Sequence, residues 1–227
     1  MKTLLTFGLL AFTLTAQATV YLVAYDPISG AMGQAVSSSG PAYVDSSRFQ
    51  IREHGLGMVG AGGLGLCGKA KPRTWLQQGL GAQEIADKVA RACDRAKPYY
   101  RLAVVTANGE IALHLGPQGC NSHNHNCTKI QGEHAGVIGG GLKAGVAEKM
   151  FSYFNSLDPA IGLECRLLST LKQTYADGGE FKNFIVANIV VSYPGRARAN
   201  IWQSKGNESS LLSKLASKMR ASGVDCR

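Results

Sequence analysis

LAVVTANGEIALH, residues 102–114, is the stretch that most clearly indicates how this sequence folds. Two runs of mostly apolar residues flank Asn108-Gly109, a dipeptide that favours a tight turn between antiparallel strands. The stretch therefore predicts a β-hairpin with strands at Leu102–Thr106 and Glu110–His114.

Other segments carry further strand patterns. Val20–Tyr25 is rich in β-branched and aromatic residues, and turn residues connect it to a second strand near Ala31–Ser37. A third strand is expected at Leu56–Ala61, before a stretch crowded with glycine. Phe184–Tyr193 is nearly all apolar, which indicates a strand buried on both faces, and Arg198–Trp202 is expected to pair with it.

The remaining long segments have the period of amphipathic helices. Apolar residues recur three or four positions apart within Trp75–Arg95, Val146–Leu157, Leu163–Tyr175 and Leu211–Met219. Glycines near position 79 are expected to separate a short first turn from the rest of the first helix. Strands and helices in this order predict an α+β domain with a mostly antiparallel sheet covered by helices.

The first eighteen residues have the composition of a cleavable export signal. Lys2 gives a basic start, Leu4–Leu14 is apolar, and small residues lead to Ala18. The apolar run is shorter than the roughly 20 residues that cross a bilayer, so no membrane span is expected. The sequence therefore predicts a signal peptide at residues 1–18, a single globular domain at residues 19–227, and an exported protein, periplasmic or secreted.

Charge and motifs limit the classes of partner. The formal net charge is +9, but the basic residues are scattered, so specific nucleic-acid binding is not expected. Gly63–Ala70 matches most of a phosphate-binding loop but has Ala70 where a hydroxyl should bind magnesium, so no nucleotide or other cofactor is predicted. The expected partner is a small-molecule or peptide-like substrate of unknown identity, and homo-oligomer formation stays open.

The six cysteines indicate disulfide bonds, because an even number in an exported chain is typical of them. Cys120 and Cys127 form the easiest local pair. With His123 and His125 the same two cysteines offer a zinc ligand set, but the spacing is cramped and unlike the usual zinc modules. We favour the disulfide and predict no metal site.

Thr19 is the candidate catalytic residue. Cleavage after Ala18 would give Thr19 a free α-amine beside its own hydroxyl, a combination in which the amine can act as base for the nucleophile. An α-amine has a pKa of about 7.7 to 8.0, so it needs little adjustment to accept a proton near neutral pH.

Four blocks of sequence resemble, in the same order, the family called domain of unknown function 1028. They are VYLVAYDPISGAMGQAVSSS at Val20–Ser39, YRLAVVTANGEIALHLG at Tyr100–Gly116, HAGVIGGGLKAGVAEKMFSYF at His134–Phe154 and DGGEFKNFIVANIVV at Asp177–Val191. Such proteins are grouped with the N-terminal nucleophile (Ntn) hydrolases. The resemblance implies a four-layer αββα sandwich of two mostly antiparallel sheets between helices, cleavage of an amide bond, and Thr19 as nucleophile with Asp26 nearby.

Three departures from the family pattern bear on this expectation. Ser37, Ser38 and Ser39 follow the second strand where many relatives have a Lys or His, so the sequence supplies no cation there; Ser37 and Ser39 remain candidates near the site. Ile138-Gly139-Gly140 stands where relatives tend to have Gln-Gly-Asn, and Ile185-Val186 replaces a polar pair in the late strand. The oxyanion donors are then expected to be backbone N–H groups of Gly139, Gly140 or Gly141. The alternative is a catalytically inactive binding protein on the same scaffold.

Overall fold

The computed structural model describes residues 19–39, 48–51, 55–60, 70–94, 100–118, 127–179, 184–195 and 200–226. The predicted export signal, the residues around Cys120 and most of the glycine-rich stretch after Leu56–Ala61 lie outside these described residues.

A six-stranded antiparallel sheet forms the centre of the molecule, in the order β10-β9-β2-β1-β8-β7. Its strands are β1 (Thr19–Asp26), β2 (Ala31–Ser38), β7 (Thr128–Gln131), β8 (Ala135–Gly140), β9 (Val186–Ser192) and β10 (Asn200–Lys205). The predicted β1–β2 hairpin and the β9–β10 pairing are confirmed. Strand β1 lies between β2 and β8, so both of its edges are hydrogen-bonded.

A second, four-stranded antiparallel sheet has the order β3-β4-β5-β6. Its strands are β3 (Arg48–Ile51), β4 (Gly55–Gly60), β5 (Arg101–Thr106) and β6 (Ile111–Leu115). The hairpin predicted around Asn108-Gly109 is confirmed, and Gly109 has the positive φ of 89° that such a turn needs. Strands β3 and β7 were not predicted; each has only four residues.

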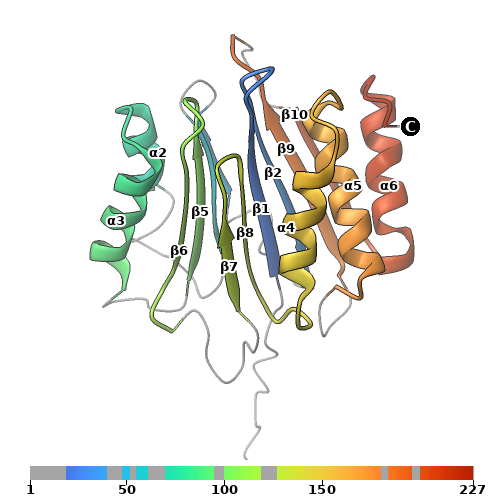
Figure 1. Cartoon of the computed structure of the whole chain (residues 1–227), viewed down its shortest axis with the longest axis horizontal. Helices are drawn as coiled ribbons and strands as arrows, with labels where there is room; N and C mark the ends of the chain where they lie inside the picture. Colours follow the sequence, from blue (N-terminus) through green and yellow to red (C-terminus); the bar gives the residue numbers. More distant parts are fainter. Residues whose placement is uncertain are drawn as a thin grey trace, which may run out of the picture.

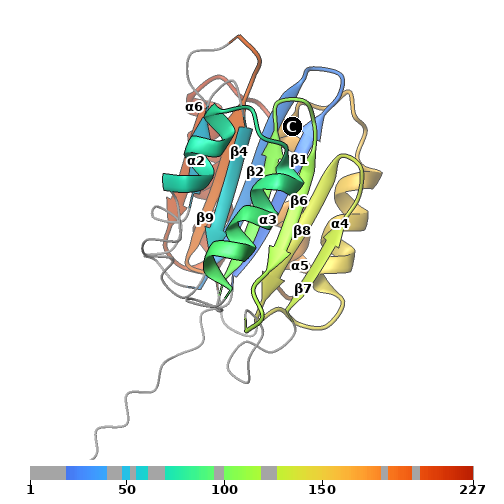
Figure 2. The ribbon, with the colours of Figure 1, turned by 90° about the vertical axis from the view of Figure 1, so that its left-hand side faces the viewer.

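Helices lie outside both sheets. The helices are α2 (Ala70–Gln77), α3 (Ala82–Cys93), α4 (Val146–Ser156), α5 (Leu163–Ala176) and α6 (Glu208–Ala221). Figures 1 and 2 show α2 and α3 beside the four-stranded sheet, and Figure 1 shows α4, α5 and α6 on the far side of the six-stranded sheet. All the predicted helices are confirmed, including the break near Gly79. The α+β class with antiparallel sheets is confirmed.

Side chains on successive residues of β1 enter two different cores. Val20 and Leu22 pack with the helices α4, α5 and α6, whereas Tyr21 and Val23 pack between the two sheets. This alternation follows from the two-residue period of a strand. It also places the side chain of Thr19 on the face of β1 that looks toward the second sheet, which we call the inter-sheet face.

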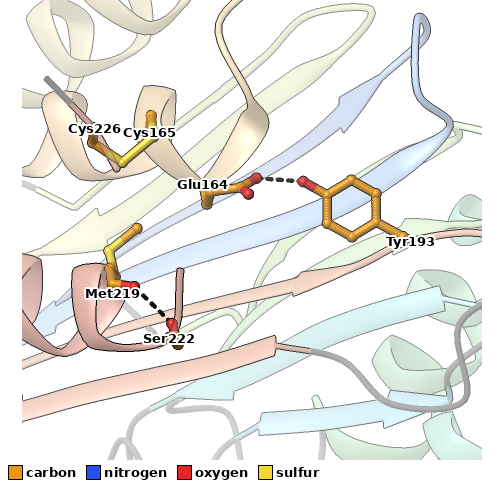
Figure 3. The surroundings of a disulfide bond; sticks show 6 residues. All are labelled: Glu164, Cys165, Tyr193, Met219, Ser222 and Cys226. Carbon is orange, nitrogen blue, oxygen red and sulfur yellow. Dashed lines mark hydrogen bonds between the residues drawn. A yellow bond between two sulfur atoms is a disulfide. The ribbon is translucent and has the colours of Figure 1, made fainter. Parts of the chain in front are cut away.

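A disulfide fixes the end of the chain. Cys165 in α5 is bonded to Cys226, across a sequence separation of 61 residues (Figure 3). Beside it, the Tyr193 hydroxyl donates to Glu164 Oε2 over 2.5 Å. No helix in the described part of the chain is both long enough and apolar enough to span a bilayer.

Candidate functional site

Thr19 begins β1 and is therefore held by two neighbouring strands. It lies opposite Ser38 of β2 and opposite Gly140 of β8 in the sheet register. Only 3% of Thr19 is exposed. Sheet pairing on both sides fixes the backbone of this residue, and a fixed backbone is what a positioned nucleophile requires.

The Thr19 hydroxyl has a defined partner. Its Oγ1 lies 2.9 Å from Ser38 Oγ, and either atom can be the donor. Both side chains lie on the inter-sheet face, because Ser38 follows Met32 and Val36 in the alternation of β2. Hydrogen bonding to Ser38 restricts the rotation of the Thr19 hydroxyl.

The two near-site candidates, Ser37 and Ser39, adjoin the partner of Thr19 in the chain but have surroundings of their own. Ser37 lies on the opposite face of β2, where its Oγ is 2.6 Å from the Tyr175 hydroxyl and donates to the Val186 carbonyl. Ser39 follows the last residue of β2 and is half-buried. Ser38, which the sequence interpretation did not select, is the serine that contacts Thr19.

A buried arginine reaches this site from the other sheet. Arg101 is the first residue of β5, and its side chain is fully buried. A Cβ atom built on Gly140 would lie 2.0 Å from Arg101 Nη2 and 2.5 Å from its Cζ. The guanidinium therefore occupies the space that a side chain at Gly140 would fill, and this position of β8 has to be glycine.

Arg101 is close to Thr19 because Gly140 is the residue paired with Thr19. In antiparallel sheets, Cβ atoms of directly opposite residues are about 4.5 to 5.5 Å apart. The guanidinium consequently lies within about 8 Å of the Thr19 Cβ. Arg101 Nη2 also donates to Cys127 Sγ over 3.6 Å, which links the guanidinium to the end of β7.

The sequence interpretation missed Arg101 because it sought a cation only after the second strand. One signal was present: Arg101 precedes Ala103 and Val105 at the two-residue spacing, so it belongs to the buried face of its strand. A charge on a buried face indicates a partner or a function.

The three glycines proposed as oxyanion donors have different surroundings. Gly139 faces the helices, where an added Cβ would meet Leu142 Cδ1 at 2.8 Å, and Gly140 faces Arg101. Both are paired residues of β8. Gly141 follows the strand with a φ of 74°, so its N–H lies where the backbone turns beyond the last paired residue. Of the three, Gly141 best fits an oxyanion donor.

Asp26 is not brought to Thr19. It ends β1, about 23 Å away at the rise of an eight-residue strand. There its Oδ1 lies 2.9 Å from Arg166 Nη2 of α5, and its Oδ2 accepts the Ser29 hydroxyl in the β1–β2 turn. The side chains of Asp26 and Arg166 are only 6% and 7% exposed, so this is a buried ion pair that joins the hairpin to a helix.

The loop before β7 is described only at its end. Cys127 is disulfide-bonded, but the candidate partner Cys120 lies outside the described residues, as do His123 and His125 of the zinc alternative. The Cys120–Cys127 bond therefore stays a prediction.

Comparison with known proteins gives one family and a solved structure. The model of a family described as "Family of unknown function (DUF1028)" matches residues 19–209. The crystal structure of protein SPO2555 from Silicibacter pomeroyi, also assigned to DUF1028, superposes with a TM-score of 0.75 at 17% identity. The match covers 91% of this chain and 87% of that one, and at this identity it supports the fold alone. No curated protein matches the sequence.

Proposed function

The chain belongs to the DUF1028 family of unknown function, and from this premise we propose that its exported form is an amidohydrolase with Thr19 as N-terminal nucleophile. One observation carries the proposal: Thr19 opens the central strand with its Oγ1 held 2.9 Å from Ser38 Oγ on the inter-sheet face. Removal of residues 1–18 would add an α-amine to that hydroxyl. The family match also begins at residue 19.

The proposed reaction has two stages. The Thr19 α-amine takes the proton of Oγ1 while Oγ1 bonds to the carbonyl carbon of the substrate amide, and the Gly141 N–H stabilises the oxyanion that forms. The carbon–nitrogen bond breaks, the leaving nitrogen takes the proton back from the ammonium, and an ester on Thr19 remains. Water, deprotonated by the same amine, then attacks the ester, which releases a carboxylic acid and restores the Thr19 hydroxyl.

The proposal includes the Ntn-hydrolase form of the fold, a four-layer αββα sandwich. Its support is the arrangement of helices outside two antiparallel sheets, with the candidate nucleophile at the start of a central strand (Figure 1). Export is likewise proposed. The Cys165–Cys226 disulfide supports it, because structural disulfides are typical of oxidising compartments outside the cytoplasm.

The test uses the exported protein and its Thr19→Ala and Thr19→Ser variants. A β-lactone probe is incubated with each, and the site of acylation is identified by peptide mass spectrometry. We expect an ester on Thr19 in the wild type and on the introduced serine in Thr19→Ser. We expect no ester in Thr19→Ala. A panel of amides should then show a loss of at least about a thousandfold in turnover for Thr19→Ala.

Two outcomes would contradict the proposal: acylation of the wild type at a residue other than Thr19, or equal turnover by wild type and Thr19→Ala.

The second candidate function is an exported binding protein without turnover. The observation that favours it is the composition of β8: Ala135–Gly140 carries no polar side chain, so an oxyanion would depend on backbone groups alone. A wild-type protein that neither reacts with the lactone nor hydrolyses any amide of the panel would favour this function.

A further inference from the structure

We infer that Arg101 is a positioning residue that keeps the α-amine of Thr19 unprotonated near neutral pH, and this inference rests on the proposed function. Arg101 would supply, from β5, the positive charge that the sequence lacks after β2. Arg101 lies within one of the four blocks that resemble the family, at Tyr100–Gly116, but the resemblance gives it no role. Its role is inferred from the packing of one sheet on the other.

The packing of Gly140 gives the guanidinium a fixed place. Arg101 and Gly140 face each other across the inter-sheet core, and the guanidinium fills the volume beside the Gly140 Cα. Because Gly140 pairs with Thr19, whatever lies over Gly140 also lies beside the first residue of β1. Nη2, the guanidinium atom nearest Gly140, also donates to Cys127 Sγ over 3.6 Å.

Two physical effects act on an amine in this position. Burial removes water from the charged ammonium, and Thr19 begins a strand that is paired on both edges and faces the core between the two sheets. The nearby guanidinium repels the same charge and keeps its own proton near neutral pH. Both effects lower the pKa of the amine. Together they are expected to move it from its usual value of about 7.7 to 8.0 to below about 7.

Few other ionisable groups face Thr19 from the described residues. Tyr21 is the next residue on the same face of β1 and is buried. Lys129 of β7 pairs with Ile138, so it lies on the inter-sheet side, but it is exposed. Cys127 is in a disulfide and does not titrate. The described inter-sheet residues of β2, β6 and β8 carry no charge. In the second sheet, Arg48 of β3 pairs with Met58 of β4, so one strand separates it from β5. Arg101, which lies over the partner of Thr19, is therefore the cation that we assign to the amine.

The test measures the amine directly and needs no substrate. Mature protein is labelled with acetic anhydride between pH 5 and 10, and acetylation of the Thr19 α-amine is followed by peptide mass spectrometry relative to its plateau at high pH. The midpoint is the pH at which acetylation of the Thr19 α-amine reaches half of that plateau. We expect it to lie below about pH 7 in the wild type and in Arg101→Lys. The midpoint should rise by about one pH unit or more in Arg101→Met.

A second variant moves the charge without deleting it. In Gly140→Ala the new methyl group must displace the guanidinium, so we expect the midpoint to rise here too. Gly136→Ala is the matched control, on the same strand and the same face. Its added Cβ would meet Ile111 and Leu113 at 3.1 Å rather than Arg101, so the midpoint should not change.

The outcomes separate this inference from the proposed function. Unchanged midpoints in Arg101→Met and Gly140→Ala, with the lactone still on Thr19, overturn the role of Arg101 alone. If Arg101→Met does not fold, an unchanged midpoint in Gly140→Ala overturns it. A mature chain with no Thr19 α-amine to label overturns the proposed function itself.

Discussion

The two ends of strand β1 each have a buried arginine that comes from another element, but the surroundings of the two guanidinium groups differ. At the Asp26 end, Arg166 forms an ion pair of 2.9 Å with a carboxylate. At the Thr19 end, Arg101 lies against Gly140, beside a pair of hydroxyl groups. The carboxylate of Asp26 compensates the charge of Arg166, and the ion pair joins β1 to α5. For the guanidinium over Gly140 we propose a different role, an effect on the ionisation of Thr19.

The largest effect is expected at the Asp26 end, and it is an effect on stability. Asp26→Ala leaves Arg166 buried without its carboxylate, which should cost about 3 to 5 kcal/mol in the free energy of unfolding. The double variant Asp26→Leu, Arg166→Met should recover most of that loss, because an apolar pair removes both charges. Urea denaturation of the single and double variants measures the difference.

The same variants also test whether the two ends are independent. We expect the midpoint of Thr19 acetylation in the Asp26 variants to equal that of the wild type, because about 23 Å separates the two ends. A shift as large as that of Arg101→Met would show that the two ends are not independent.

A smaller effect is expected from the neighbouring serines of β2. Ser38→Ala removes the partner of the Thr19 hydroxyl, so turnover on a responsive amide should fall by about tenfold. Ser37→Ala is the control one residue away, on the other face. It removes bonds to Tyr175 and Val186 and should cost about 1 kcal/mol of stability without a kinetic change. Equal kinetics for the two variants would contradict the assignment of faces.

The smallest effect concerns Lys129, the exposed cation on the same side of the sheet. Lys129→Ala should move the Thr19 acetylation midpoint by less than about 0.3 pH unit, because water and salt screen an exposed charge. A shift comparable to that of Arg101→Met would transfer the proposed role from the buried cation to the exposed one.

The elements could be predicted from the sequence because their signals are local. The four-residue spacing of Ile85, Val89 and Cys93 indicates a helix, and Asn108-Gly109 indicates a hairpin, whatever the rest of the chain does. Strands β3 and β7 have four residues each, too few for a periodic pattern to stand out.

The site depended on information that a local pattern does not contain. Choosing Ser38 over Ser37 and Ser39 requires knowing which residues of β2 point to which face of the sheet. A shift of one residue in the register would move every side chain to the opposite face. Arg101 and Gly140 are about forty positions apart in the chain and belong to different sheets. Placing one over the other requires knowing how the two sheets stack. Thr19 itself could be proposed from the sequence, because its proposed chemistry depends on a cleavage site and not on the fold.

The central claim is that Thr19 acts through a free α-amine beside its hydroxyl, and the N-terminal residue of the exported protein tests it most directly. Intact mass and N-terminal sequencing of protein recovered from outside the cytoplasm should give a chain that begins at Thr19. A chain that retains the signal peptide of residues 1–18, or one that begins at any residue other than Thr19, would contradict the account.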